Sequence, residues 1–225
     1  MRALRTQWLD AGGGLGYHLR AWRHGAQWQP YRAALAGWLQ AWQPPQRQLV
    51  IIGPSAGHTL PGDFLEGFSR VFILEPDPLA RWLLLRRFPR VRFEAGALDC
   101  FADAQAPGWL ACTYPDAVFL FANVIGQYLP ADPGWVPALR QALAERSWAS
   151  CHDLVASTRT PDNTSPRDVS EGQTLEALLT GFWPAGELDL HDHGSWQTLP
   201  TQAATIWSIT PRQHHLVGWY AQRAG

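Results

Sequence analysis

The sequence predicts an α/β protein, a Rossmann-like three-layer sandwich around a mostly parallel sheet. Short apolar runs at 49–53, 71–75 and 117–122 alternate with amphipathic segments, which is typical of parallel strands joined by helical crossovers. A glycine-bounded turn, Gly53 to Gly57, follows the first run, and Glu75 ends the second. The separation of 75 − 53 = 22 positions suits an acid that hydrogen-bonds a ribose hydroxyl about 20 residues after such a turn.

Composition excludes several classes of protein. The formal net charge of −1 gives no general attraction for nucleic acid or for an anionic membrane, and the apolar runs are too short to span a bilayer. All 18 basic residues are Arg, so Schiff-base chemistry and a Walker-type phosphate loop, which both need Lys, are excluded. The N-terminus has no apolar signal-peptide core, and three scattered cysteines indicate reduced thiols, so we expect a cytoplasmic protein. The oligomeric state stays open.

Residues 1–45 are predicted to form a helical leader or cap, and residues 46–225 the Rossmann-like domain. The stretch 12–16 is rich in glycine, but no apolar strand precedes it, which disfavours a phosphate loop. A helix is expected from near Tyr17, either after a flexible turn or as a mobile lid that carries Tyr17 and His18 over a pocket. A second helix begins near Pro30 and ends before Pro44-Pro45.

From residue 48, strands and helices alternate. After the strand at 49–53, a short helix is expected from Pro61-Gly62 to about residue 68. The strand at 71–75 is followed by Asp77, which suits a helix N-cap, with Pro78 at the first position of a helix over 79–88. A third strand is expected at 91–95, then a looser segment at 97–114.

The second half continues the alternation and then changes. The strand at 117–122 precedes a helix marked by Trp135 and Leu139, and a fifth strand covers about 148–152, ending at His152-Asp153. Residues 157–170 read as a polar surface loop, and Ser170 with Gln173 resembles a capping box that opens a helix. Apolar runs at 205–209 and 215–220 around Pro211 predict an antiparallel hairpin.

Over 48–222 the chain resembles the class I S-adenosylmethionine-dependent methyltransferases. The segment Gly53-Pro54-Ser55-Ala56-Gly57 falls on their glycine motif, Glu75-Pro76 on their ribose-binding acid, and the segment 121–127 on their motif after the fourth strand. The resemblance implies a seven-stranded sheet that ends in an antiparallel hairpin. It also implies S-adenosyl-L-methionine as cofactor and transfer of its methyl group to a small-molecule acceptor.

The same resemblance implies a set of cofactor-binding residues. Two of these residues, Gly96 and Asp99, are matched only approximately. The family often has an adenine-binding acid at about the position of Gly96, and Asp99 is the nearest acid. The others shape the glycine turn, hold the ribose or line the wall shared with the acceptor. The full set is Gly53, Ser55, Gly57, Glu75, Asp77, Gly96, Asp99 and Asn123.

Two other functions stay open. Ile51 stands where the family usually has an acid that helps to hold the methionine ammonium group, which motivates a catalytically silent S-adenosylmethionine-binding module. The turn around Ser55 also matches the nucleophile elbow of an α/β serine hydrolase, with Asp153 and His191 following in the required order.

His152 is the predicted general base, since an imidazole can titrate near neutrality and the residue is expected at the ligand edge of the sheet. The alternative is a histidine inside a longer strand that is hydrogen-bonded locally. The segments His191-Asp192-His193 and His214-His215 carry potential metal ligands, but no known helix motif spacing supports a site, so none is predicted.

Overall fold

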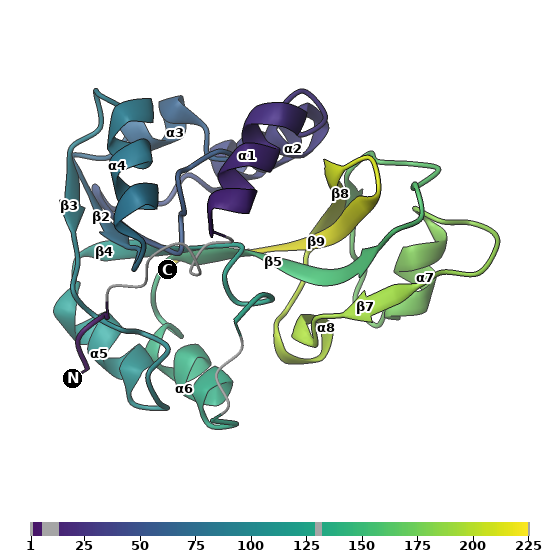
Figure 1. The fold of residues 1–225 in the computed structure, drawn as a ribbon. Helices are drawn as coiled ribbons and strands as arrows, with labels where there is room; N and C mark the ends of the chain where they lie inside the picture. The colour runs from purple at the N-terminus through teal and green to yellow at the C-terminus, as the bar shows by residue number, and fades with distance from the viewer. Residues whose placement is uncertain (1, 6–13, 129–131, 225) are drawn as a thin grey trace.

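The computed structural model describes residues 2–5, 14–128 and 132–224 (Figure 1). Within them one sheet runs in the order β3-β2-β1-β4-β5-β9-β8-β6, with β7 paired to the far half of β5. The strands are β1 (Gln48–Ile52), β2 (Arg70–Leu74), β3 (Phe93–Ala95), β4 (Ala117–Ala122), β5 (Trp148–Ser157), β6 (Arg167–Asp168), β7 (Leu190–Asp192), β8 (Ala203–Thr210) and β9 (Gln213–Gln222).

The first five strands in the chain pair in parallel, and β9 is antiparallel to both β5 and β8. Apart from the short strands β6 and β7, this is a seven-stranded, mostly parallel sheet that ends in an antiparallel hairpin. The predicted fold class is therefore confirmed.

Helices cover both faces of the sheet. They are α1 (Gly14–His24), α2 (Gln29–Trp42), α3 (Gly62–Glu66), α4 (Pro78–Arg87), α5 (Ala106–Thr113), α6 (Trp135–Ala142), α7 (Leu175–Thr180) and α8 (Ser195–Thr198). Figure 1 shows α1–α4 on one side of the sheet and α5 and α6 on the other. The apolar run of β1 alternates between the two cores, since Leu49 and Ile51 belong to one cluster and Val50 and Ile52 to the other.

Local sequence explains several helix boundaries. Asp77 accepts a hydrogen bond from the Leu79 amide at 2.8 Å, and Pro78 occupies the first helical position of α4, as predicted. The helix α7 begins later than the capping-box interpretation implies, because Thr174 caps it by accepting from the Ala177 amide. The Gln173 side chain instead accepts from the Ser170 amide in the preceding turn.

Three features after residue 96 differ from expectation. The looser segment 97–114 contains the helix α5, whose start at Ala106-Pro107-Gly108 hides a helical pattern. Strand β5 continues to Ser157 because its apolar pattern does not stop at residue 152. The polar loop at 157–170 ends in β6, and β7 and α8 follow α7.

The leader packs directly onto the hairpin. Trp28 is fully buried and donates its indole N–H to the carbonyl of Ile209 in β8 at 3.0 Å. Trp42 donates likewise to the carbonyl of Gln222 in β9. The predicted glycine-rich stretch at 12–16 lies in part outside the described residues, which resume at Gly14 in α1. In the part of the chain that the structure describes, no helix is both long and apolar enough to cross a membrane.

Candidate functional site

The candidate site lies where the order of successive strands in the sheet reverses. Successive strands run outward from β1 through β2 to β3 on one side and from β4 to β5 on the other, so β1 and β4 flank the topological switch point. Open α/β sheets bind ligands at this point, beyond the carboxyl ends of the strands. The glycine turn follows β1 and the segment beginning at Asn123 follows β4, so both lie at this edge.

Glu75 ties the end of β2 to the glycine turn. Its Oε2 accepts the Ser55 amide at 2.8 Å and its Oε1 accepts the Asp77 amide at 3.0 Å. The side chain is only 1% exposed, and this burial raises its pKa, while the two backbone N–H groups oppose the rise. Each carboxylate oxygen keeps a second lone pair for a further donor.

Two nearby polar groups have no partner among the described residues. Asn123 adopts a left-handed backbone with φ of 58°, and both its Nδ2 and Oδ1 atoms are buried and unpartnered. The Oδ2 atom of the fully buried Asp77 is unpartnered as well, since Oδ1 alone serves as the α4 cap. Buried polar atoms are normally hydrogen-bonded, so unpartnered ones mark places where a ligand can bind.

The glycine turn is closed by the protein's own side chains. Gly53 and Gly57 have φ of 66° and 63°. A Cβ on Gly53 would lie 2.7 Å from Cβ of Val124, and one on Gly57 would lie 2.5 Å from Cδ1 of Leu84. Both glycines therefore permit close packing within the protein, and Val124 occupies the side of Gly53 on which a Cβ would stand.

The positions matched to adenine binding are also engaged within the protein. A Cβ on Gly96 would lie 2.4 Å from Leu74 and 2.5 Å from the Tyr114 hydroxyl. Asp99 is half-buried and accepts the Phe101 amide at 3.1 Å, while its own amide donates to Arg2.

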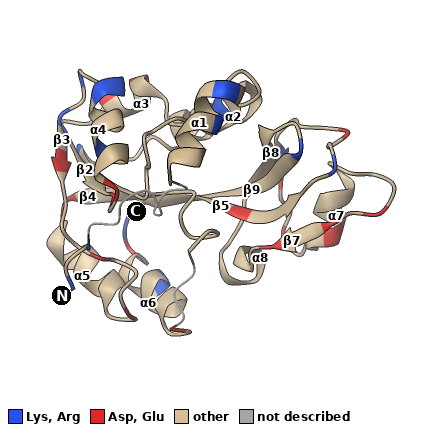
Figure 2. Ribbon diagram, in the orientation of Figure 1, with Lys and Arg blue, Asp and Glu red and all other residues tan. Residues whose placement is uncertain are grey.

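A cationic and aromatic group lies beside the glycine turn, and sequence reasoning missed part of it. Arg87 donates to the carbonyl of Ala56 at 3.2 Å and contacts Nδ1 of His58 at 2.7 Å, and His18 contacts Nε2 of His58 at 3.1 Å. Burial, followed by the charge of Arg87, lowers the pKa of His58 to about 3. His18 and Tyr17 of α1 thus lie at the turn, and Figure 2 shows arginines in α1, α2 and α4 on this side of the sheet.

His152 lies inside β5 rather than at the end of a strand. It is fully buried, its Nδ1 lies 3.2 Å from Oγ of Ser150, and its Nε2 lies 3.2 Å from Oγ1 of Thr201. Burial lowers its pKa to about 4. This environment matches the alternative interpretation of His152, a locally hydrogen-bonded histidine inside a longer strand. It disfavours the predicted role of His152 as general base.

The next residue, Asp153, belongs to a cluster that sequence spacing did not reveal. Its Oδ2 lies 3.0 Å from Nδ1 of His215 and accepts from Nε2 of Gln127 at 3.2 Å. The hydrolase interpretation took Asp153 and His191 as an example of its acid and histidine, but Asp153 pairs with His215. Ser55 is buried at 7% exposure, with its amide bound to Glu75, which also disfavours a nucleophile elbow.

No family model and no curated protein matches this chain. Among solved structures, magnesium protoporphyrin IX methyltransferase from Synechocystis PCC 6803 with bound SAH aligns at a TM-score of 0.47 and 12% identity, over 88% of this chain and 84% of that one. The methyltransferase domain of a bacterial Hen1 aligns at 0.38 and 11%, over 56% of this chain and 66% of that one. A putative Zn-dependent alcohol dehydrogenase from Rhodobacter sphaeroides aligns at 0.41 and 12%, over 80% and 86%. These low values assign neither an activity nor a ligand to this chain.

Proposed function

We propose that this protein binds S-adenosyl-L-methionine and transfers its methyl group to a small-molecule acceptor. The observation that carries the proposal is the buried Glu75 carboxylate, bound to the Ser55 amide of the glycine turn at the switch point of the sheet. This arrangement supports the proposal, because an acid beside a glycine turn at the switch point of a parallel sheet is suited to bind the hydroxyls of a ribose.

The residues present suit the parts of the cofactor. The remaining lone pairs of Glu75 and the unpartnered Oδ2 of Asp77 can accept the ribose hydroxyls. The Asn123 amide offers a donor and an acceptor from the end of β4. Arg87, beside the Ala56 carbonyl, supplies positive charge for the methionine carboxylate.

The bound cofactor would supply an activated methyl group on its sulfonium. The protein then has to align the acceptor with that methyl group and to exclude water. The segment after β4, which carries Asn123 and Val124, lies between the glycine turn and β5 and is suited to this task.

A silent cofactor-binding module is the second candidate. Val124 fills the space next to Gly53, and Ile51 is an apolar residue that is fully buried. Both observations favour weak binding of the methionine part of the ligand, without turnover.

Titration calorimetry with S-adenosylmethionine and S-adenosylhomocysteine tests binding. We expect the wild-type protein to bind both, and Asn123→Gly to bind at least tenfold more weakly, about 1.4 kcal/mol. Glu94→Gln is the matched control, because Glu94 forms ion pairs with Arg70 and Arg92 at the half-exposed strand β3 and should leave affinity unchanged. Absence of binding at millimolar ligand refutes both candidates, and binding without methyl transfer to a broad acceptor panel selects the module.

Asn123→Gly separates binding from folding. Glycine tolerates the left-handed backbone at this position. The change also removes a buried side-chain amide without partners, and the presence of such a group typically costs a folded protein about 1–3 kcal/mol. The free energy of unfolding is therefore expected to stay level or to rise in urea titrations. A clear loss of stability would show that the amide has a structural role.

A further inference from the structure

Asp153, His193 and His215 converge from three separate segments. Asp153 belongs to β5 and His215 to β9, while His193 directly follows β7. One carboxylate oxygen and one ring nitrogen of each histidine lie within 4.8 Å of one another. The closest pair, Oδ2 of Asp153 and Nδ1 of His215, is 3.0 Å apart.

Strand pairing holds these side chains in place. β5 pairs with β9 along its length, with a bulge between Asp153 and Val155, and bulges commonly redirect side chains near functional sites. β7 pairs with the same end of β5, and the His193 amide donates to the Leu154 carbonyl at 3.0 Å. The cluster is therefore built on a rigid framework, as a preformed ligand site requires.

The cluster contains polar atoms without partners. Asp153 is 0% exposed, yet its Oδ1 has no hydrogen-bond partner among the described residues, and neither does the buried Nε2 of His193. A buried carboxylate oxygen and a buried ring nitrogen that lack protein partners are positioned to bind a cation.

We propose that Asp153, His193 and His215 bind a divalent first-row transition-metal ion of the zinc or iron(II) type. Two imidazole nitrogens and one carboxylate oxygen are the donors that such ions prefer, whereas Mg²⁺ prefers oxygen alone. Ligand bonds of about 2.0–2.2 Å place tetrahedral donors roughly 3.3 Å apart, close to the Asp153–His215 separation. Three protein ligands leave a position for water or for an oxygen of a bound small molecule.

The surrounding residues suit this role. Gln127 donates to Oδ2 of Asp153 and orients the carboxylate. Nε2 of the Gln213 amide lies 3.1 Å from Nε2 of His215. Rotating this terminal amide by 180° turns its oxygen toward the ring, where it accepts a proton from Nε2 and leaves Nδ1 for the metal.

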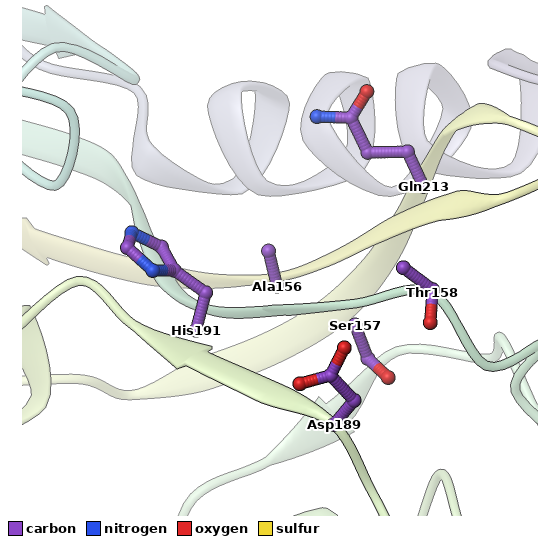
Figure 3. Close-up of a pocket in the computed structure, with 6 residues that line it drawn as sticks. All are labelled: Ala156, Ser157, Thr158, Asp189, His191 and Gln213. Carbon is purple, nitrogen blue, oxygen red and sulfur yellow. The ribbon is translucent and has the colours of Figure 1, made fainter.

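A surface hollow of about 120 Å³ lies next to the cluster. Figure 3 shows His191 projecting from β7 and Gln213 from β9, with Ala156 of β5 between them. The His191 ring lies 4.8 Å from the His193 ring, so the hollow reaches the residues around the site. The hollow is lined by neighbours of the cluster, His191 and Gln213, and by none of the three ligands.

Metal binding is measured directly, without S-adenosylmethionine, so that it can fail or succeed independently of the proposed function. All proteins carry Cys112→Ser, since Cys112 is an exposed thiol that can bind metal by itself. The chelator-treated protein is titrated with Zn²⁺ by calorimetry, and Co²⁺ is used as a visible-absorption probe. We expect one equivalent of Zn²⁺ and a Co²⁺ spectrum typical of nitrogen and oxygen ligands, with no competition from Mg²⁺.

Variants locate the site. His193→Gln, at a half-buried position, should weaken Zn²⁺ binding at least about 100-fold, and Gln127→Ala, at an exposed position, about 10- to 100-fold. His191→Gln is the matched control and should keep wild-type affinity. Absence of stoichiometric Zn²⁺ and Co²⁺ binding overturns the proposal, as does binding that is unaffected by His193→Gln.

Discussion

Glu75 is a buried residue at the end of β2, and Asn123 is a half-buried residue at the end of β4 whose side-chain amide atoms are buried. The two side chains differ in their hydrogen bonding. Both oxygens of Glu75 accept backbone N–H groups, so its removal would loosen the glycine turn whether or not a ligand binds there. The side-chain amide of Asn123 has no partner among the described residues, so we expect its loss to leave the folded chain intact and to affect a ligand alone. Asn123 is therefore the sharper probe of function.

His58 provides a prediction for pH dependence. Burial and the charges of Arg87, His18 and Arg32 lower its folded pKa to about 3, from an ordinary value of 6.5. Below pH 6.5 the unfolded chain takes up a proton that the folded chain does not, so His58 makes the protein less stable as pH falls from 6.5 toward 3.

His58→Gln should reduce this sensitivity, because the amide can still accept from Arg87 and donate to His18 without titrating. Urea midpoints at pH 7 and pH 5 measure it: the wild-type midpoint falls at pH 5, and the variant midpoint falls less. Equal falls in the two proteins would mean that His58 titrates normally in the folded state.

At the scale of elements, the glycine turn joins β1 to the helical layer through α4. Leu84 and Phe88 contact the backbone of Gly57, so the turn and the buried face of α4 form one packed unit. The same packing explains why glycine is needed in this protein even without a bound cofactor.

Gly57→Ala should lower the free energy of unfolding by about 2–4 kcal/mol, since it adds a Cβ at positive φ, 2.5 Å from Leu84. Gly37→Ala is the matched control. Gly37 lies inside α2 with nothing within 4 Å of the added Cβ, so this change should stabilise by about 0.5–1 kcal/mol. Urea titration measures the free energy of unfolding of both variants. An unchanged free energy of unfolding in Gly57→Ala would show that the turn accommodates the added Cβ.

At the scale of the whole molecule, the sequence predicts those strands and helix ends that are determined by a local pattern of residues. The apolar runs of β1 and β4 and the Asp77-Pro78 start of α4 carry their own local pattern and capping, so the sequence predicts them correctly. No sequence pattern relates Asp153 to His193 and His215, because only strand pairing joins them. The sequence also does not show that Gly53 faces Val124. A glycine is needed at a close approach whether the neighbour is a ligand or a side chain, so the glycine itself does not tell which of the two is present.

The predicted division at residue 45 can be tested through Trp28. Its indole is fully buried, donates to Ile209 of β8, and packs edge-on against Trp207 with ring centroids 5.1 Å apart. These contacts join the leader to the hairpin, so the two should unfold together. Trp28→Ala should cost about 3–5 kcal/mol, and Trp28→Phe less, because it keeps most of the apolar contact.

Hydrogen exchange distinguishes a joined leader from a separable cap. If the leader and the hairpin form one cooperative unit, Trp28→Ala accelerates amide exchange in β8 and β9 as much as in α2, and urea unfolding stays a single transition. A separable cap gives faster exchange in α1 and α2 alone, with β8 and β9 protected as in the wild type. The hydrogen bond from Trp28 to Ile209 spans 181 positions of sequence, and for this reason we expect the first result.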